Sequence, residues 1–236
     1  GTNLRIGRQS PTGGGVLGRF DGVQAGYSFR PKWRLNAVAG VPFDRLLDSK
    51  RHFYGASIDA EALTPEFSGS LYGIQQVIDG EIDRRALGTE LRYFSAGVSV
   101  FGTLDYDTIL RGLNIASVQG TWIAEDSTTV NVLYDRRATP MLMLGNALFF
   151  QDPNKPLVTR LKDILGTDTI EALRRNVKDT NSRTTQALLG VTRPIGANWE
   201  AGADIRLTNV GAIAPVPVIL PEGAASTGNL WSLGGQ

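Results

Sequence analysis

The chain contains a single histidine, His52, which limits the acid–base chemistry open to it. A serine nucleophile such as Ser49 or Ser57 needs a base within hydrogen-bond reach. A lone histidine beside charged residues such as Asp48 and Arg51 is typical of a solvated loop. The chain has no cysteine, so disulfides and thiolate metal sites are excluded. We therefore expect that this chain is not an enzyme.

Carboxylates near two neighbouring strand ends could approach one another: Asp79, Glu81, Asp83, Asp105 and Asp107. Ca²⁺ takes about six to eight oxygen ligands, and the spacing of these residues matches no known calcium loop. We expect solvated carboxylates at a rim of the fold instead. The glycine run 13–15 is no phosphate loop, because no lysine–serine pair follows it and it opens no helix. No metal and no cofactor is predicted.

A further set of charged residues alternates with apolar residues. In segment 199–207 the apolar residues point one way, whereas Glu200, Asp204 and Arg206 point the other. Such alternation indicates a β-strand whose two faces meet different surroundings. The predicted polar-face charges are Arg34, Asp59, Glu61, Glu90, Arg92, Asp105, Asp107, Asp135, Arg137, Glu200, Asp204 and Arg206.

Alternating segments of about ten residues recur roughly a dozen times along the 236 residues. They predict an all-β fold with strands near 3–10, 19–30, 33–41, 53–62, 70–79, 85–94, 97–107, 112–122, 127–137, 183–193, 199–207 and 227–235. No stretch approaches the ~18 consecutive apolar residues of a membrane-spanning helix. The 24 basic and 23 acidic residues leave no electrostatic footprint for nucleic acid, so no nucleic-acid partner is expected.

Link lengths alternate along the chain. Every second link is brief, as at 30–32, 95–96, 125–126 and 196–198, and the links between are mostly longer, at 10–18, 43–52, 137–182 and 210–226. Short turns on one rim and long loops on the other are typical of outer-membrane barrels. Aromatic residues at strand ends predict two interfacial girdles. The predicted girdle residues are Phe29, Trp33, Tyr93, Trp122 and Trp199 near short turns, with Tyr106 and Tyr134 at the opposite ends.

One segment breaks the β pattern. From 155 to 178 the apolar residues take helical spacing, with Gly166 as a candidate C-cap and Asp168 with Glu171 as a candidate capping box. The longest loop is therefore predicted to carry a short helical insert. The insert could fold into the mouth as a constriction, stand outside as a lid, or have no gating role.

The dyad strands, alternating loop lengths and aromatic strand ends resemble the Gram-negative outer-membrane β-barrel class over nearly all of the chain. Segment 4–9, ending in Gly7-Arg8-Gln9, is similar to strands of porins and alginate-export-type barrels, and segment 16–41 resembles barrels of exopolysaccharide exporters. The resemblance implies a transmembrane antiparallel up-and-down barrel of about twelve or more strands, 1–236, located in the outer membrane. Two departures leave open a longer barrel: the chain begins inside a strand and lacks the terminal aromatic typical of the class.

Charged residues cannot face hydrocarbon, where an arginine at the midplane costs about 2–4 kcal/mol. They are therefore predicted to line a lumen, and eight of the twelve are acidic, which favours a mildly cation-selective channel. Alternatively, Glu90 with Arg92, Asp135 with Arg137 and Asp204 with Arg206 belong to cross-strand ion-pair networks that brace the wall.

Three functions stay open at this stage. The first is a passive channel or porin that passes solutes or a polymer. The second is the barrel of an exopolysaccharide or secretion system that works with a periplasmic scaffold, and the third is a non-conducting surface structural or adhesive barrel. The expected partners are outer-membrane lipid, such a scaffold or secretion partner, and further copies of the chain. A soluble β-sandwich is the non-membrane alternative, and it requires a second sheet to cover the apolar faces.

Overall fold

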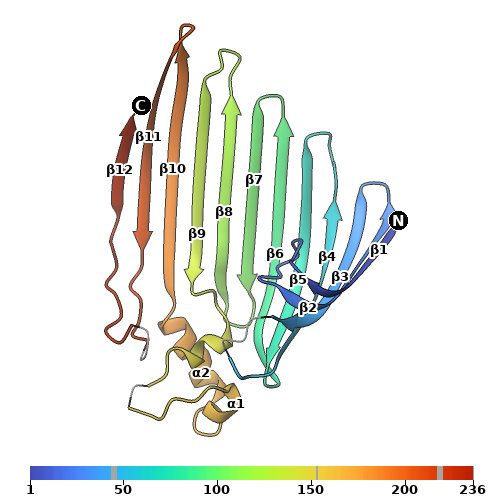
Figure 1. Ribbon diagram of the computed structural model, residues 1–236, viewed down its shortest axis with the longest axis vertical. Coiled ribbons are helices and arrows are strands. Elements are labelled where there is room, and N and C mark those ends of the chain that lie inside the picture. Colours follow the sequence, from blue (N-terminus) through green and yellow to red (C-terminus); the bar gives the residue numbers. More distant parts are fainter. Residues whose placement is uncertain (44–46, 153, 217–219, 236) are drawn as a thin grey trace.

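The computed structural model describes residues 1–43, 47–152, 154–216 and 220–235. Its twelve strands form a single antiparallel sheet in which every strand pairs with the next one along the chain (Figure 1). The predicted all-β, up-and-down arrangement is therefore confirmed. The strands are β1 Thr2–Gln9, β2 Phe20–Arg30, β3 Trp33–Pro42, β4 Arg51–Ala60, β5 Phe67–Ile78, β6 Glu81–Ser95, β7 Val98–Asp107, β8 Gly112–Ile123, β9 Thr129–Thr139, β10 Ser182–Ile195, β11 Trp199–Val210 and β12 Leu230–Gly235.

Strand pairing carries the alternation of side chains across the whole sheet. Residues directly opposite one another face the same side, so Leu87 shares a face with Gly73 on β5 and Tyr106 on β7. Following the pairs from β1 to β12 collects most of the large exposed apolar side chains on one face, which we call the apolar face. Its members include Leu4, Val23, Leu35, Tyr54, Leu71, Leu87, Leu104, Val118, Val132, Leu189, Ile205 and Leu233. We call the opposite side the polar face.

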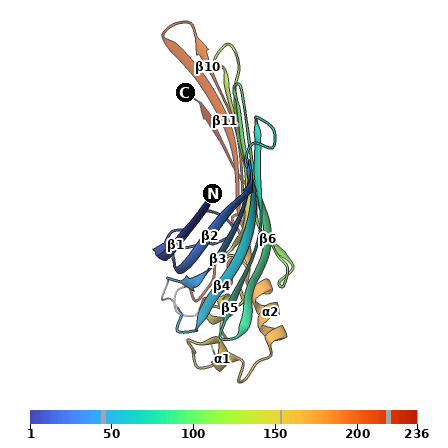
Figure 2. The ribbon, with the colours of Figure 1, turned by 90° about the vertical axis from the view of Figure 1, so that its right-hand side faces the viewer.

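The sheet is curved rather than flat. Its edge strands β1 and β12 both lie to the same side of β6 (Figure 2). Strands β1 and β12 do not pair with each other among the described residues, so closure of the barrel stays a prediction. Within the described ranges no second sheet covers the apolar face, where side chains such as Leu233 are 83% exposed. A sandwich needs that cover, and its absence here argues against the soluble alternative.

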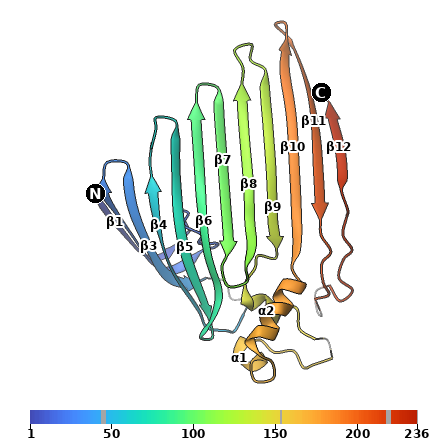
Figure 3. The same ribbon diagram turned by 180° about the vertical axis from the view of Figure 1, so that it is seen from behind.

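The helical insert lies at the ends of the strands that carry the long loops (Figures 1 and 3). It consists of a 3-10 helix η1 Leu144–Leu148 and two α-helices, α1 Leu161–Ile164 and α2 Ile170–Asp179, so the predicted short helical insert is confirmed. The N-cap of α2 is Thr169, whose hydroxyl accepts the Ala172 N–H at 3.2 Å. The predicted cap at Asp168 was one residue early. No helix among the described residues is both long and apolar enough to cross a membrane.

The largest buried apolar cluster joins this insert to the rim of the sheet. Leu161 and Val177 of the helices, 0% and 1% exposed, pack with Ile78 at the end of β5 and Leu110 in the β7–β8 turn. The core of the molecule therefore sits at the long-loop rim and not between two layers of sheet. Long loops ordered this way form a compact cap whose position is set by the strand ends.

Asp79 ties three segments of this cap together. It occupies the two-residue β5–β6 turn, and its carboxylate accepts the Lys50 N–H at 2.7 Å and the Lys162 N–H of α1 at 3.3 Å. The Ser49 hydroxyl accepts the Leu161 N–H at 2.9 Å and also donates to Asp79. Partial burial raises the pKa of Asp79, but these hydrogen bonds outweigh it and hold the pKa below its usual range.

Acid should therefore loosen the cap. A carboxylate whose pKa is lowered by folding stabilises fully above its unfolded pKa of about 3.9, and the contribution is lost as the pH falls through the folded pKa. We expect Asp79→Asn to speed hydrogen exchange of the 158–166 amides at pH 6, with the two proteins converging once the pH falls below the lowered folded pKa of Asp79. Comparison at equal pH cancels intrinsic exchange rates. Equal exchange at pH 6 would show that Asp79 does not hold the insert.

Candidate functional site

The polar face gathers the charged side chains that the sequence singled out. By strand register, eleven of the twelve occupy polar-face positions of β3, β4, β6, β7, β9 and β11. Glu61 follows the end of β4 and lines the same cavity as Asp59. Whether this face lines a lumen is not decided by its register, so that role stays a prediction.

A loop that the sequence did not single out lies across this face. Residues 10–18, between β1 and β2, extend in front of β5 and β6 on the side toward which the sheet edges curve (Figures 1 and 2). The Thr12 hydroxyl accepts a hydrogen bond from Gln24 Nε2 of β2 at 2.7 Å. Three residues on, the Gly15 carbonyl accepts one from Arg84 Nη1 of β6 at 3.0 Å. The loop therefore bridges strands four positions apart in the sheet.

Glycines give this loop its close fit. Gly13, Gly14 and Gly15 all have positive φ values, 112°, 69° and 75°, which side chains of other residues rarely adopt. A Cβ atom on Gly15 would overlap the ring of Tyr72, so the backbone lies directly against that ring. The sequence predicted only that the glycine run is no phosphate loop, and in the structure the run allows close packing on the sheet.

An apolar cluster holds the far end of the loop. Val16 packs against Phe20, Phe53, Ile74 and Ala86, all of which are buried. The rings of Phe20 and Phe53 meet edge to face with centroids 5.1 Å apart. Burial of these rings, at about 25 cal/mol per Å² of apolar area, fixes the loop at its rim end.

Beneath the loop lies an open cavity of about 360 Å³. Charges of both signs line it: Arg5, Arg34 and Arg92 with Asp59, Glu61 and Glu90. Small hydroxyl and amide side chains fill the space between these charges, including Thr12, Gln24, Asn36, Ser57, Ser68 and Ser70. The surface offers many hydrogen-bond donors and acceptors and few apolar contacts, so it suits a hydrated polar solute.

The floor of the cavity is organised by a short hydrogen-bond chain. Arg34 Nε donates to Asn36 Oδ1 at 3.0 Å, and Asn36 Nδ2 donates to Asp59 Oδ2 at 2.6 Å. Asn36 also donates to the Ser57 hydroxyl at 3.1 Å. The two bonds of Asn36 cross from β3 to β4 and link polar side chains that line the cavity.

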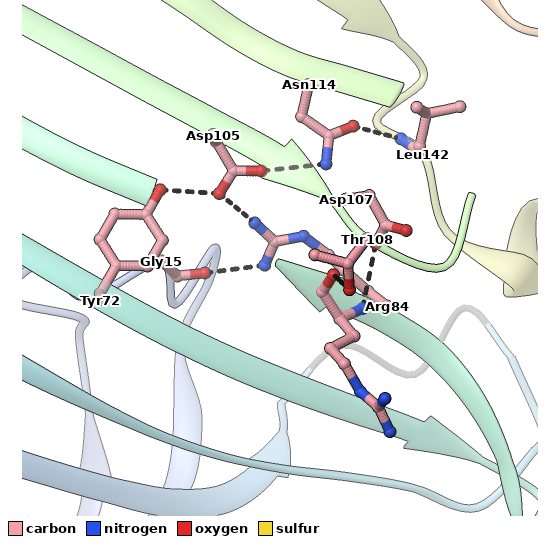
Figure 4. Close-up of polar contacts among 9 residues, drawn as sticks. Gly15, Tyr72, Arg84, Asp105, Asp107, Thr108, Asn114 and Leu142 are labelled. Carbon is pink, nitrogen blue, oxygen red and sulfur yellow. Dashed lines mark hydrogen bonds and ion pairs between the residues drawn. The ribbon is translucent and has the colours of Figure 1, made fainter. Parts of the chain in front are cut away.

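A buried polar network fixes loop 10–18 to the sheet (Figure 4). Arg84 and Asp105 are both 1% exposed and form an ion pair from Arg84 Nη2 to Asp105 Oδ2 at 2.5 Å. The Tyr72 hydroxyl donates to the same carboxylate oxygen at 2.7 Å, and Asn114 Nδ2 donates to the other at 3.0 Å. With both carboxylate oxygens bonded, the charges are stabilised away from water.

Two β-bulges orient the network toward a second loop. The strand registers leave Asp83 unpaired on β6 and Asn114 unpaired on β8, and an extra residue of this kind re-aims a side chain. The Asp83 carboxylate accepts the Gly145 N–H at 2.7 Å, and the Asn114 carbonyl oxygen accepts the Leu142 N–H at 2.9 Å. Both bulges thus anchor segment 140–149 beside the network.

Two of the predicted lumen-lining residues need correction here. Asp105 and Asp107 are 1% and 0% exposed, so neither faces open space. Asp107 caps the β7–β8 turn by accepting the N–H groups of Arg85, Ile109 and Leu110. Buried Asp83, Asp105 and Asp107 are also not the solvated carboxylates we expected. No group of three or more potential metal ligands is found in the part of the chain that the structure describes.

The predicted ion pairs form, but within strands. Asp135 with Arg137 and Asp204 with Arg206 join at 2.8 Å and 2.7 Å, and Glu90 with Arg92 at 3.7 Å, each two positions apart on one strand. The expectation of cross-strand networks is therefore wrong. Because exposed pairs contribute about 0.2–1 kcal/mol each, these pairs do little to brace the wall. Glu200, at the short-turn end of β11, is exposed.

The predicted girdle residues all lie on the apolar face by register. The rings of Phe29 and Trp33 contact each other across the β2–β3 turn with centroids 6.5 Å apart. Tyr93, Trp122 and Trp199 lie near other short turns, and Tyr106 lies one residue from the loop end of β7. Tyr134 is an exception, because it sits in the middle of β9 and not at a strand end.

His52 lies in β4, opposite Val77, and not in the preceding loop. Register places its side chain on the apolar face, where it is exposed. Ser49 bonds Leu161 and Asp79, whereas Ser57 bonds Asn36 and Asp59.

No protein-family model matches this chain, and no curated protein matches it. One solved structure is similar: OmpT, folded in vitro, an outer membrane protein of Vibrio cholerae. The match has 12% identity and a TM-score of 0.43, and it covers 98% of this chain and 74% of that one.

One expectation is corrected. The chain was predicted not to be an enzyme, but one histidine and no cysteine do not exclude catalysis by other residues, so the prediction is withdrawn. At this identity and TM-score the match names neither a reaction nor a catalytic residue for this chain.

The Arg84–Asp105 pair should dominate the stability of this region. Arg84→Met leaves the Asp105 charge buried without its counter-ion, which typically costs about 3–5 kcal/mol. Arg92→Met, on the same strand and face but with a side chain 58% exposed, should change stability by no more than about 0.5 kcal/mol. Urea unfolding followed by tryptophan fluorescence measures both. Equal losses of stability in the two variants would show that the buried network does not anchor this region.

Proposed function

We propose that this sheet forms the wall of an outer-membrane channel for small polar solutes, narrowed by loop 10–18. The observation that carries the proposal is the contrast between the two faces of one sheet. The apolar face is uncovered among the described residues, whereas the polar face holds a charged cavity beneath an anchored loop. A bilayer outside and water inside satisfy both faces at once.

The extent of the apolar face matches a bilayer. On β10 the apolar-face charges are Arg183 near the loop end and Arg193 near the short turn, with Ala187, Leu189 and Val191 between them. Ten residues at about 3.3 Å each, tilted by roughly 40°, span about 25 Å across the membrane. Outer-membrane barrels carry an apolar band of about that height. The long loops then lie on the extracellular side.

We expect the selectivity for cations to be weaker than the sequence suggested. With Asp105 and Asp107 buried in bonds, six of the predicted acidic residues remain on the polar face beside four predicted arginines. Arg5 and Arg51, which were not predicted, share this face by register. The charges are thus close to balanced. The sheet wall carries both signs around the cavity and loop 10–18 carries no charge, which favours neutral-polar or zwitterionic solutes over one ion type.

Membrane placement is tested by a matched pair of arginine substitutions. Leu189 lies on the apolar face and Leu188 on the polar face at the same depth of β10. We expect Leu189→Arg to lower the free energy of unfolding in lipid vesicles by about 2–4 kcal/mol, and Leu188→Arg to cost much less. A larger cost for Leu188→Arg would place the bilayer on the wrong face, and a chain that stays monomeric without detergent would end the membrane proposal.

Channel function is tested by conductance in a planar bilayer. Removing residues 11–17 should raise the single-channel conductance severalfold, because the loop residues that cover the cavity lie in this segment. Shortening 221–226 is the matched control, since that stretch of a long loop lines no part of the cavity. Reversal potentials under a salt gradient should be small in both proteins. Insertion without conductance in either variant would instead favour a non-conducting surface barrel.

A further inference from the structure

The apolar face is free of carboxylates over β5–β11 within the described ranges, yet it carries arginines at the long-loop end. By register these are Arg85 on β6, Arg136 on β9 and Arg183 on β10. Aspartate and glutamate on the same strands lie on the polar face, in turns or at bulges. Arginine is therefore the charged residue type found at the long-loop end of the apolar face on these strands.

These arginines form a staggered row near the long-loop end of the sheet, because the strand registers align Arg136 with Thr89 of β6, four residues from Arg85. Arg136 lies opposite Thr185, and Arg183 is two residues from Thr185 on the same strand. Arg85 lies three strands away from Arg136, and Tyr106 of β7 stands between them on the same face. With strands about 4.8 Å apart, the row from β6 to β10 spans roughly 19 Å.

The row has no ionic partner among the described residues. Arg85 Nε donates to Gln75 Oε1 at 2.7 Å, a neutral acceptor, and Arg136 and Arg183 form no ion pair. Other arginines of the apolar face do have one: Arg8 pairs with Asp21 at 2.9 Å, and Arg193 with Asp126 at 3.5 Å. The contrast identifies a surface with uncompensated positive charge.

We propose that Arg85, Arg136 and Arg183 bind the phosphate groups of a membrane lipid whose acyl chains lie on the adjoining apolar band. The proposal rests on the proposed function, which puts this face in the bilayer. Guanidinium groups bond phosphate oxygens in pairs. Directly below the row, Leu87, Tyr134 and Ala187 begin the apolar band, so the two parts of an anionic amphiphile meet complementary surfaces in the right order.

Charge and position together select this occupant. A second protein chain would have to bury the arginines against carboxylates and cover the apolar band as well. Phosphorylated lipids satisfy both features, because their headgroups lie at the depth where the band ends and their acyl chains cover the band. Arginines at the membrane surface attract anionic headgroups.

Native mass spectrometry of the refolded chain in a neutral detergent tests the proposal, with dioleoyl phosphatidic acid as the probe. We expect the triple variant Arg85→Gln/Arg136→Gln/Arg183→Gln to bind it about tenfold or more weakly. Dioleoylglycerol, which has the same chains without phosphate, should bind both proteins equally. Inorganic phosphate should fail to displace the lipid.

A matched control separates the site from general charge. The variant Arg92→Gln/Arg137→Gln/Arg206→Gln loses the same charge from the polar face and should bind phosphatidic acid as the parent does. Equal weakening in both triple variants would overturn the site, and displacement by inorganic phosphate would overturn the lipid as its occupant. If the chain inserts and conducts while the first triple variant binds normally, the lipid site alone is wrong. If the chain needs no detergent, the proposed function fails with it.

Discussion

The whole structure depends on one constraint: every strand pairs only with its neighbours in the chain, so the side of each residue is passed on from strand to strand. A slip by one residue would move a complete strand's apolar side chains to the other face. Most of the large exposed apolar residues of the twelve strands nevertheless stay on one face, and most of the carboxylates lie on the other. Because the sheet has no second layer in the described residues, only this parity separates the two faces.

The regular register is interrupted at two bulges near the long-loop rim. Asp83 and Asn114 each add one residue without a partner, and parity resumes beyond them. Both side chains turn toward segment 140–149, beside the buried pair of Arg84 and Asp105. The regular wall and the ordered loops therefore meet at the irregular positions. The two bulged residues hold segment 140–149, whereas Arg84, at a regular position beside one bulge, holds loop 10–18.

The contrast between regular and bulged strand positions also explains which features the sequence could predict. Alternation depends on each residue's own type, so the strand positions, the polar-face charges and the helical insert could be inferred from the sequence. The strand predicted at 85–94 began only after the bulge, whereas β6 begins at Glu81. The unpaired residue Asp83 breaks the two-residue alternation next to Arg84, which anchors loop 10–18. Arg84 could not be singled out for the same reason, whereas Tyr72 lies in a regular part of β5 and its role depends on its contact with the distant Asp105.

Loop direction was beyond the sequence because it depends on contacts between distant residues. The longest and most patterned loop, with its helices, was the natural candidate for a constriction, yet it packs on strand ends through Ile78 and Leu110. The short glycine-rich loop lies over the polar face instead, since only glycine lets its backbone reach Tyr72. Amphipathic periodicity reports that a segment needs a surface to cover. It does not report which surface.

The distribution of charge on the apolar face can be explained by side-chain length. Arg183 and Arg193 sit near opposite ends of one strand, and their long apolar stems can lie on the band while the guanidinium groups reach the polar region beyond it. Aspartate is too short to do this, and Asp21 occurs on this face only with Arg8 bonded to it. A water-exposed sheet would have no reason to favour arginine over carboxylate at these positions. The preference for arginine over aspartate therefore indicates that this face ends at an interface rather than in water, because only the longer side chain reaches the polar region.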